Sequence, residues 1–201
     1  LRTPLTSIYG YAQLLQMGNI SEEETYEGLE YIMKESKRLN KMSGEMLSMR
    51  LLERSCTDFV KVNLNKVALH IRRILAETLE NKQIELVESF QTEECQGNEE
   101  EFIILFRNLL ENAVRASREK SIVEWTAEQQ ENGYLFKVKD YGIGMEKEEL
   151  EKVKDAFYRI DKGRSRSEGG AGLGLSIVDT IVKKWNGKLW IESVKDVGTT
   201  V

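Results

Sequence analysis

The sequence is poor in the residues that build metal clusters, disulfide frameworks and membrane spans. Its 201 residues include two cysteines, Cys56 and Cys95, and one histidine, His70, so the ligand spacing of a zinc site is absent. No run of about 18 apolar residues predicts a membrane-spanning helix. We therefore expect a cytoplasmic protein with two reduced structural thiols, and contact with a membrane only through segments upstream of this sequence.

Positive charge is also scarce. The formal net charge is -5, which gives no general attraction to nucleic acids or anionic lipids, so nucleic acid is not an expected partner. Any anion site must therefore be local. The sequence begins without Met at Leu1 and ends at Val201, just after Gly-Thr-Thr, which is typical of a piece of a longer protein.

The first part of the sequence, residues 1–54, predicts a helical hairpin. A first helix is indicated by apolar residues at alternating spacings of four and three, namely Leu1, Leu5, Ile8, Ala12 and Leu15. Pro4 predicts a bend near its start unless the helix begins there. Gly18 with Asn19 ends this helix, and the capping box of Ser21 and Glu24 begins a second, antiparallel one.

The second helix carries an apolar seam with coiled-coil spacing and should reach about Glu53. The seam consists of Ile32, Leu39, Met42, Met46 and Met49, interrupted by Glu35. Two helices cannot enclose their own apolar stripes, so we expect the hairpin to pair with a second copy in a homodimeric four-helix bundle. The alternative is that the hairpin packs on the rest of the chain.

Residues 57–201 predict an α+β domain in which strands and helices are interleaved. The expected elements are a strand at 59–62, a helix at 64–80, a strand around 84–87, a helix from Asn98 to Ser117, a hairpin turning at Asn132-Gly133, a helix from about 172 to 185, and strands around 189–194 and from Thr199. A hairpin within such an alternation favours a mixed sheet covered on one face by helices. The fold class is thus a helical hairpin followed by a two-layer α/β sandwich.

Two glycine motifs are candidates for a ligand site. Asp140 stands at a predicted strand end, and Gly142 and Gly144 after it let the backbone approach a flat ligand; an ordinary turn is the alternative. The second motif runs from Gly170 to Leu175 and opens a helix, where free amide groups favour phosphate. Its spacing fits neither the Walker loop nor the dinucleotide fingerprint.

Polar residues inside an apolar helix suggest a metal. Asn108 and Asn112 are four residues apart and share one helix face, with Arg115 three residues further on. Amide oxygens suit Mg²⁺, which keeps waters and phosphate oxygens as its other ligands.

A run of cations lies between the two glycine motifs. It consists of Arg159, Lys162, Arg164 and Arg166, interleaved with small residues. In an acidic protein such a run predicts a lid that closes on a polyphosphate, whereas a solvated loop is the alternative.

Together these motifs resemble the transmitter region of sensor histidine kinases, over essentially the whole sequence. The matching stretches are the asparagine motif at 105–117, the first glycine motif at 140–144, the phenylalanine motif at Phe157-Tyr158-Arg159, the second glycine motif at Gly170, Ala171, Gly172, Leu173, Gly174 and Leu175, and the last motif at Gly198-Thr199-Thr200. The resemblance implies ATP and Mg²⁺ as ligands, in the open sandwich shared with gyrase, heat-shock chaperone and mismatch-repair ATPases.

By that resemblance, Asp140 accepts a hydrogen bond from the adenine amine, supported by Thr199 or Thr200 through water. Asn112, with Asn108 beside it, would hold Mg²⁺. Arg115 and the lid cations would hold the phosphates, with Gly170, Gly172 and Gly174 at the far hinge of the lid.

Leu1-Arg-Thr-Pro-Leu5 resembles the end of the family's phosphoacceptor motif, so the phosphorylated histidine is expected just upstream of Leu1. His70 is no substitute, because no such motif surrounds it. By the same resemblance, Thr3 occupies the position that, in this family, orients water when the response-regulator partner is dephosphorylated. The resemblance further implies the cytoplasmic part of a membrane-bound sensor, which passes its phosphoryl group to a receiver-domain aspartate.

Two other functions remain as alternatives. A conformational ATPase of the gyrase or chaperone type would need a glutamate four residues before the Mg²⁺ asparagine, where this sequence has Asn108. The second alternative is a scaffold that binds a nucleotide without turning it over. The sequence also departs from the family at Asn98, often Asp, and at Arg115-Ala116, often Lys-Tyr.

Overall fold

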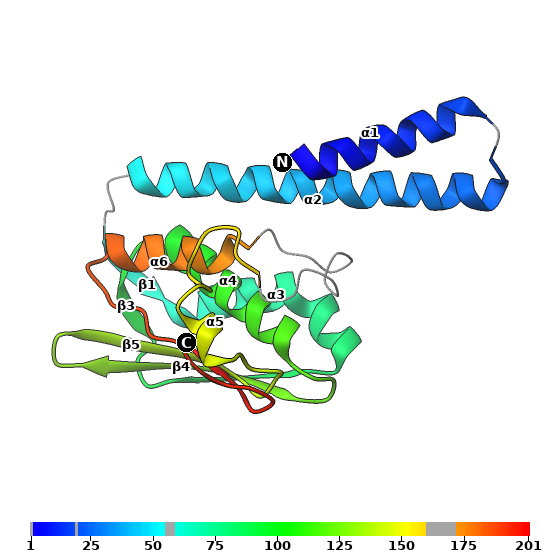
Figure 1. The fold of residues 1–201 in the computed structure, drawn as a ribbon. Coiled ribbons are helices and arrows are strands. Elements are labelled where there is room, and N and C mark those ends of the chain that lie inside the picture. The colour runs from blue at the N-terminus through cyan, green and yellow to red at the C-terminus, as the bar shows by residue number, and fades with distance from the viewer. Residues whose placement is uncertain (1, 19, 55–58, 160–171) are drawn as a thin grey trace.

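The computed structural model of the chain describes residues 2–18, 20–54, 59–159 and 172–201. Helices α1 (Arg2–Met17) and α2 (Glu22–Arg54) form the expected antiparallel hairpin (Figure 1). Pro4 lies in the first turn of α1, where its missing N–H removes no helical hydrogen bond. At the turn, the Ser21 amide donates to Glu24 Oε2 (2.8 Å) and the Glu24 amide donates to Ser21 Oγ (3.2 Å). The capping box is thus confirmed.

The apolar seam of α2 differs from the expectation. Its C-terminal half packs on the rest of the chain, along α6 and the core beneath it: Met42 is buried, and Met46 and Met49 are partly buried against the same core. Glu35, which interrupts the seam, is only 4% exposed and lies 3.4 Å from Arg38. The packing that we considered the alternative therefore covers this half of the seam. Elsewhere the hairpin leaves large apolar side chains exposed, namely Leu5, Tyr9, Leu14, Tyr26, Leu29, Met33 and Leu47.

The second part of the chain is built on a five-stranded mixed sheet, which confirms the predicted fold class. Its strands are β2 (Glu85–Phe90), β4 (Ile122–Gln130), β5 (Gly133–Asp140), β6 (Glu192–Val194) and β7 (Gly198–Thr200). Their order is β2-β4-β5-β7-β6, with β2 parallel to β4 and the other neighbours antiparallel. The hairpin at Asn132-Gly133 is confirmed.

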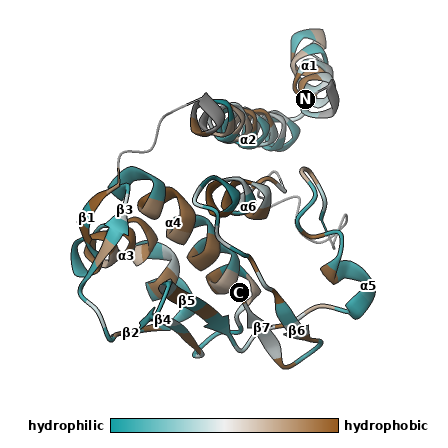
Figure 2. Cartoon of the chain, turned by 90° about the vertical axis from the view of Figure 1, so that its left-hand side faces the viewer, coloured by the Kyte–Doolittle hydropathy of each residue, from teal (hydrophilic) through white to brown (hydrophobic). Residues whose placement is uncertain are grey.

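Three helices cover one face of this sheet (Figure 2). They are α3 (Leu64–Lys82), α4 (Glu99–Ala116) and α6 (Gly174–Lys184). Asn98, where the family often has Asp, still caps α4, because its side chain accepts a hydrogen bond from the Glu101 amide. None of the described helices is long and apolar enough to cross a membrane.

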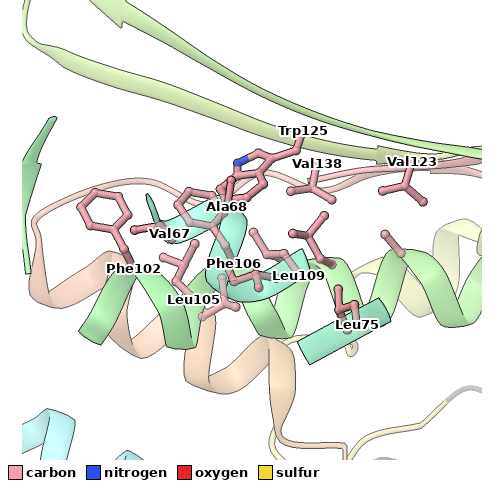
Figure 3. Packing of buried hydrophobic residues seen from close by; sticks show 14 of the residues in the cluster. Val67, Ala68, Leu75, Phe102, Leu105, Phe106, Leu109, Val123, Trp125 and Val138 are labelled. Atoms are coloured by element: carbon pink, nitrogen blue, oxygen red, sulfur yellow. The ribbon is translucent and has the colours of Figure 1, made fainter. Parts of the chain in front are cut away.

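The core lies between the sheet and these helices (Figure 3). Phe106 of α4 is fully buried, and its ring centroid lies 4.5 Å from that of Trp125 on β4 and 5.2 Å from that of Phe136 on β5. Phe102 stacks on Phe106 at 5.7 Å. These aromatic contacts hold α4 against the centre of the sheet.

The sequence pattern missed two short elements, β3 (Glu94–Gly97) and α5 (Lys147–Leu150). The strand β3 is polar, and it exists because it pairs with β1 (Val60–Asn63). Its Cys95 is free and buried, and burial raises the pKa of the thiol to about 12, which suits a structural thiol. Cys56 lies outside the described residues.

We predict that Phe106→Ala lowers the free energy of unfolding by about 3–5 kcal/mol, because it leaves a cavity between α4 and the sheet. Denaturant unfolding followed by far-UV circular dichroism measures this change. Leu69→Ala on α3 is the control: Leu69 is 52% exposed, so its loss should cost well under about 1 kcal/mol. Equal losses in the two variants would contradict this account of the core.

Candidate functional site

The end of β5 places a buried carboxylate under the first glycine motif. Asp140 is 5% exposed, and its Oδ1 accepts a hydrogen bond from the Gly142 amide at 2.9 Å. Burial raises the pKa of this carboxyl, while hydrogen bonds from the Gly142 and Thr199 amides oppose the rise. The result is a buried acceptor held in one orientation.

Strand register separates the two threonines that the resemblance offered as alternatives. Asp140 pairs with Thr199 across β5 and β7, so their side chains share one face of the sheet, whereas Thr200 is paired with Lys139 and faces the other way. Thr199 is therefore the residue that accompanies Asp140.

A second hydroxyl, which sequence reasoning missed, completes this end of the site. Ser193 on β6 lies opposite Thr199, and their hydroxyl oxygens are 2.9 Å apart. Ser193 Oγ also accepts from the Met145 amide at 2.8 Å. Only the strand register brings Ser193 here, so no local motif could have shown it.

The structure explains why the first motif needs glycine at positions 142 and 144, which the sequence alone did not show. A Cβ on Gly142 would lie 2.1 Å from the carbonyl oxygen of Ala116, at the end of α4. Gly144 has φ +58°, and its Cβ would lie 2.0 Å from the Val194 carbonyl oxygen on β6. The close neighbour at both positions is the protein's own backbone, which ties the motif to α4 and β6.

The asparagines of α4 face the start of α6. Asn108 is 6% exposed and its Nδ2 donates to the Ile104 carbonyl oxygen at 2.7 Å, which leaves Oδ1 directed toward α6. A Cβ on Gly174 would lie 3.1 Å from that Oδ1 and 3.5 Å from Nδ2 of Asn112. The two predicted amides are thus brought together with the second glycine motif.

Cations gather beside these amides. Arg115 donates to Asn112 Oδ1. The pKa of Arg159 is lowered, first by burial and then by the positive charges of Arg38 and Arg115. Arg38 comes from α2 of the hairpin, and no local motif indicated that it would reach the site. The predicted cations Lys162, Arg164 and Arg166, and Gly170, lie outside the described residues.

The remaining residues of the predicted site have backbone or core positions. Gly172 has φ +78°, its carbonyl oxygen accepts from the Phe157 amide at 2.8 Å, and a Cβ there would lie 2.7 Å from the Tyr158 carbonyl oxygen. Leu173 is 1% exposed and Leu175 packs on the same core, so both anchor α6. Their contribution is to hold the helix start in place.

Two residues lie apart from this arrangement. Thr3 is in the first turn of α1, and His70 is exposed on α3. The described site thus combines hydrogen-bond acceptors at the end of the sheet with amides on α4 and the arginines beside them. Such a site suits a ligand that carries both an amino group and negative charge.

Comparison with protein families gives two matches, which together cover about four fifths of the chain and leave residues 56–96 unmatched. Residues 97–201 match the histidine kinase-, DNA gyrase B- and HSP90-like ATPase family, and residues 1–55 match the His kinase A (phospho-acceptor) domain. Among curated relatives, the sensor protein kinase WalK of Staphylococcus aureus (strain MRSA252) is 30% identical over 207 residues, and that of Staphylococcus saprophyticus is 31% identical over 209. Each match covers 100% of this chain but 34% of the relative, so the chain spans about a third of their length.

Solved structures share the fold. The Acinetobacter baumannii histidine kinase AdeS aligns with a TM-score of 0.75 and 17% identity, over 99% of this chain and 93% of its own. Histidine kinase ThkA, in complex with response regulator protein TrrA, aligns with a TM-score of 0.77 and 21% identity, over 99% and 56%. Full-length ShkA in complex with AMPPNP aligns with a TM-score of 0.71 and 21% identity, over 99% and 42%.

We predict that Asp140→Asn stabilises the folded chain by about 1 kcal/mol at neutral pH, because it removes a buried charge and keeps an acceptor for the Gly142 amide. A raised carboxyl pKa means that the folded state binds more protons, so wild-type stability falls as pH rises. The advantage of the variant should therefore grow between about pH 3 and pH 7.

Urea unfolding of both proteins across that pH range measures the difference. Asp155→Asn, at an exposed position, is the control and should show no such trend. A difference that shrinks toward neutral pH would overturn the assignment of Asp140 as a carboxylate destabilised by burial.

Proposed function

Because this chain belongs to the sensor histidine kinase family, we propose that it is the transmitter core of such a kinase, with residues 57–201 binding Mg²⁺-ATP. The γ-phosphoryl group would pass to a histidine just upstream of Leu1, and from there to an aspartate of a response regulator. The carrying observation is that one site brings together the Asp140–Thr199 acceptors, the α4 amides and three arginines. Phosphoryl transfer needs mainly positioning and neutralised charge, which this arrangement offers.

The sheet end of the site is the proposed adenine pocket. An ionised carboxylate offers about four lone-pair sites, so Asp140 can accept from the adenine amine in addition to the Gly142 and Thr199 amides. Thr199 lies on the same face of the sheet and would support the base, whereas Thr200 faces away, so we propose Thr199 alone. A nucleotide at this site is supported by ShkA, which has the same fold and was crystallised in complex with AMPPNP.

Asn112, with Asn108 beside it, is the proposed Mg²⁺ site. The described residues hold no group of three or more His, Cys, Asp or Glu that could bind a metal by itself, so an ion here would take most of its ligands from phosphates and water. Asn112 Oδ1 suits this role because its lone pairs face a positively charged group: it accepts a hydrogen bond from the Arg115 guanidinium. The ion would supply charge neutralisation at the phosphates.

The phosphates would lie against the arginines. The pKa of Arg159 is lowered first by its burial and then by the positive charges of Arg38 and Arg115, and an anion beside these arginines would relieve their repulsion. Arg38 extends this positive region onto the hairpin. We propose that Lys162, Arg164 and Arg166 join them from the lid, whose far hinge includes Gly170, Gly172 and Gly174.

Residues 1–54 are proposed as the dimerisation and phosphotransfer hairpin. The exposed apolar side chains on α1 and α2 have no cover from the described part of the chain, and a second copy would bury them. Thr3 would orient water for dephosphorylation of the partner. The proposed partner is a response-regulator receiver domain. Support comes from ThkA, which has the same fold as this chain and whose structure was solved in complex with response regulator protein TrrA.

The two WalK relatives are about three times as long as this chain, and we propose that sensing belongs to segments outside it. We propose that it forms the cytoplasmic part of a membrane-bound sensor, where ATP and response regulators are available. The ATPase alternative has less support, because position 108 carries a buried amide bonded to its own helix instead of a glutamate.

Extending the chain upstream by a few dozen residues of the parent protein tests the proposal. Incubated with labelled ATP, the longer chain should acquire label that is labile in acid and stable in base, as expected for phosphohistidine. The 201-residue chain should bind Mg²⁺-ATP and acquire no label. Label on the 201-residue chain, or steady phosphate release without label on the longer one, would overturn the proposal.

We also predict that Asn112→Ala weakens Mg²⁺-dependent ATP binding by at least about tenfold, because a ligand of the ion is lost. Binding of ATP in EDTA should change little. Calorimetric titration with and without Mg²⁺ measures both. Gln130→Ala, which removes an exposed amide at the far end of β4, is the matched control and should bind as wild type.

A further inference from the structure

Ser193 is the centre of a small hydrogen-bond network behind Thr199. Its oxygen lies 2.8 Å from the Met145 amide nitrogen, 3.0 Å from the Gly198 carbonyl oxygen and 2.9 Å from Thr199 Oγ1. Ser193 is part-buried on β6, and Thr199 is 9% exposed. Three partners around a single hydroxyl leave few ways to arrange its proton.

The directions of two of these hydrogen bonds are fixed by chemistry. The Met145 N–H can only donate, so Ser193 Oγ accepts from it. The Gly198 carbonyl can only accept, so the single proton of Ser193 goes to it. The third contact then has one solution, in which the Thr199 hydroxyl donates to Ser193 Oγ.

This arrangement decides what Thr199 can offer to a ligand. With its proton directed to Ser193, Thr199 Oγ1 presents lone pairs only. Its neighbour across the β5–β7 ladder, Asp140, is also an acceptor when ionised. The sheet end of the site is therefore an acceptor-only surface.

We propose that Ser193 is a positioning residue for base selection, which orients the Thr199 hydroxyl so that the site favours a 6-aminopurine over a 6-oxopurine. The proposal rests on the nucleotide site proposed above. A 6-amino group, or a water that donates both to N1 of the base and to Thr199, matches acceptors on the protein. A 6-oxopurine could still donate from its N1–H to these acceptors, but its 6-oxygen would face lone pairs on the protein, which leaves polar groups unpaired at that position.

Comparison of Mg²⁺-ATP with Mg²⁺-ITP tests this, because the two differ only in the 6-substituent and the proton on N1. Both affinities are measured by calorimetry on the 201-residue chain. In Ser193→Ala the Thr199 hydroxyl is free to turn and donate into the site, so the preference for ATP over ITP should narrow by about three- to tenfold. Ser193→Thr keeps the hydroxyl and should retain the wild-type preference.

The ratio separates this role from a structural one, since partial unfolding lowers both affinities together and leaves the ratio unchanged. Ser121→Ala, which loses a hydroxyl bonded to the Arg118 carbonyl in another loop, is the control and should keep the wild-type ratio. If Ser193→Ala does not fold, Ser193→Cys replaces the hydroxyl by a weaker donor of similar size and should narrow the ratio in the same direction.

The outcomes distinguish this inference from the proposed function. No binding of either nucleotide by the wild-type chain would overturn the nucleotide site itself. Binding of ATP by the wild type, with an unchanged ATP-to-ITP ratio in Ser193→Ala or Ser193→Cys, would overturn the role of Ser193 alone. A narrowed ratio with retention in Ser193→Thr supports it.

Discussion

The packing of α4 between the sheet and α6 is the constraint on which the candidate site depends. Apolar contacts hold one side of the helix, with Phe106 enclosed by Trp125 and Phe136. A buried polar contact holds the other: Glu101 accepts from Lys184 Nζ at 2.5 Å and from Trp185 Nε1 at 2.6 Å, both at the end of α6. A carboxylate that is 5% exposed would be costly without such partners. Because α4 is held at both sides, its asparagines meet the start of α6 at a defined separation.

The C-terminal end of α4 joins the two halves of the site. Lys82 Nζ donates to the carbonyl oxygens of Val114 and Arg115, each at 3.0 Å, and so satisfies groups that a helix end leaves unpaired. The Ala116 carbonyl accepts from the Ile143 amide at 3.1 Å. The helix that carries the amides is thus bonded to the loop that follows Asp140, which leaves little freedom between Asp140 and the polar residues of α4.

The hairpin contributes to the site through its contact with this domain. Met42 is buried in the common core, and Lys41 Nζ lies 3.0 Å from Glu111 Oε2, next to Asn112. The ion pair is partly exposed and contributes little by itself, so the apolar contact is the larger stabilising term. The position of this ion pair is nonetheless informative, since a shift of α2 along α4 would move Arg38 relative to Arg115 and Arg159. The hairpin and residues 59–201 are therefore linked beside the residues that are proposed to hold Mg²⁺ and the phosphates.

Local patterns were enough for most elements, because apolar periodicity, caps and turns act over a few residues. The Ser21–Glu24 capping box, the turn at Asn132-Gly133 and the amphipathic α3 and α4 all follow from their own stretches of sequence. The strand β3 did not, because its residues are polar and only pairing with β1 makes it a strand. The half of the α2 seam that packs on α6 was also missed, since periodicity shows that a helix face needs cover and not which surface covers it.

The same division holds for the site. By itself the sequence determined that Asp140, the two asparagines and the glycine motifs belong to one family's pattern, because each motif is contiguous and its residue types carry the chemistry. Only the tertiary structure decided that Thr199 accompanies Asp140, that Ser193 lies behind it, that Arg38 approaches from the hairpin, and that Gly142 and Gly144 make room for backbone. Those relations depend on strand register and on contacts between residues far apart in the chain, which no short pattern encodes.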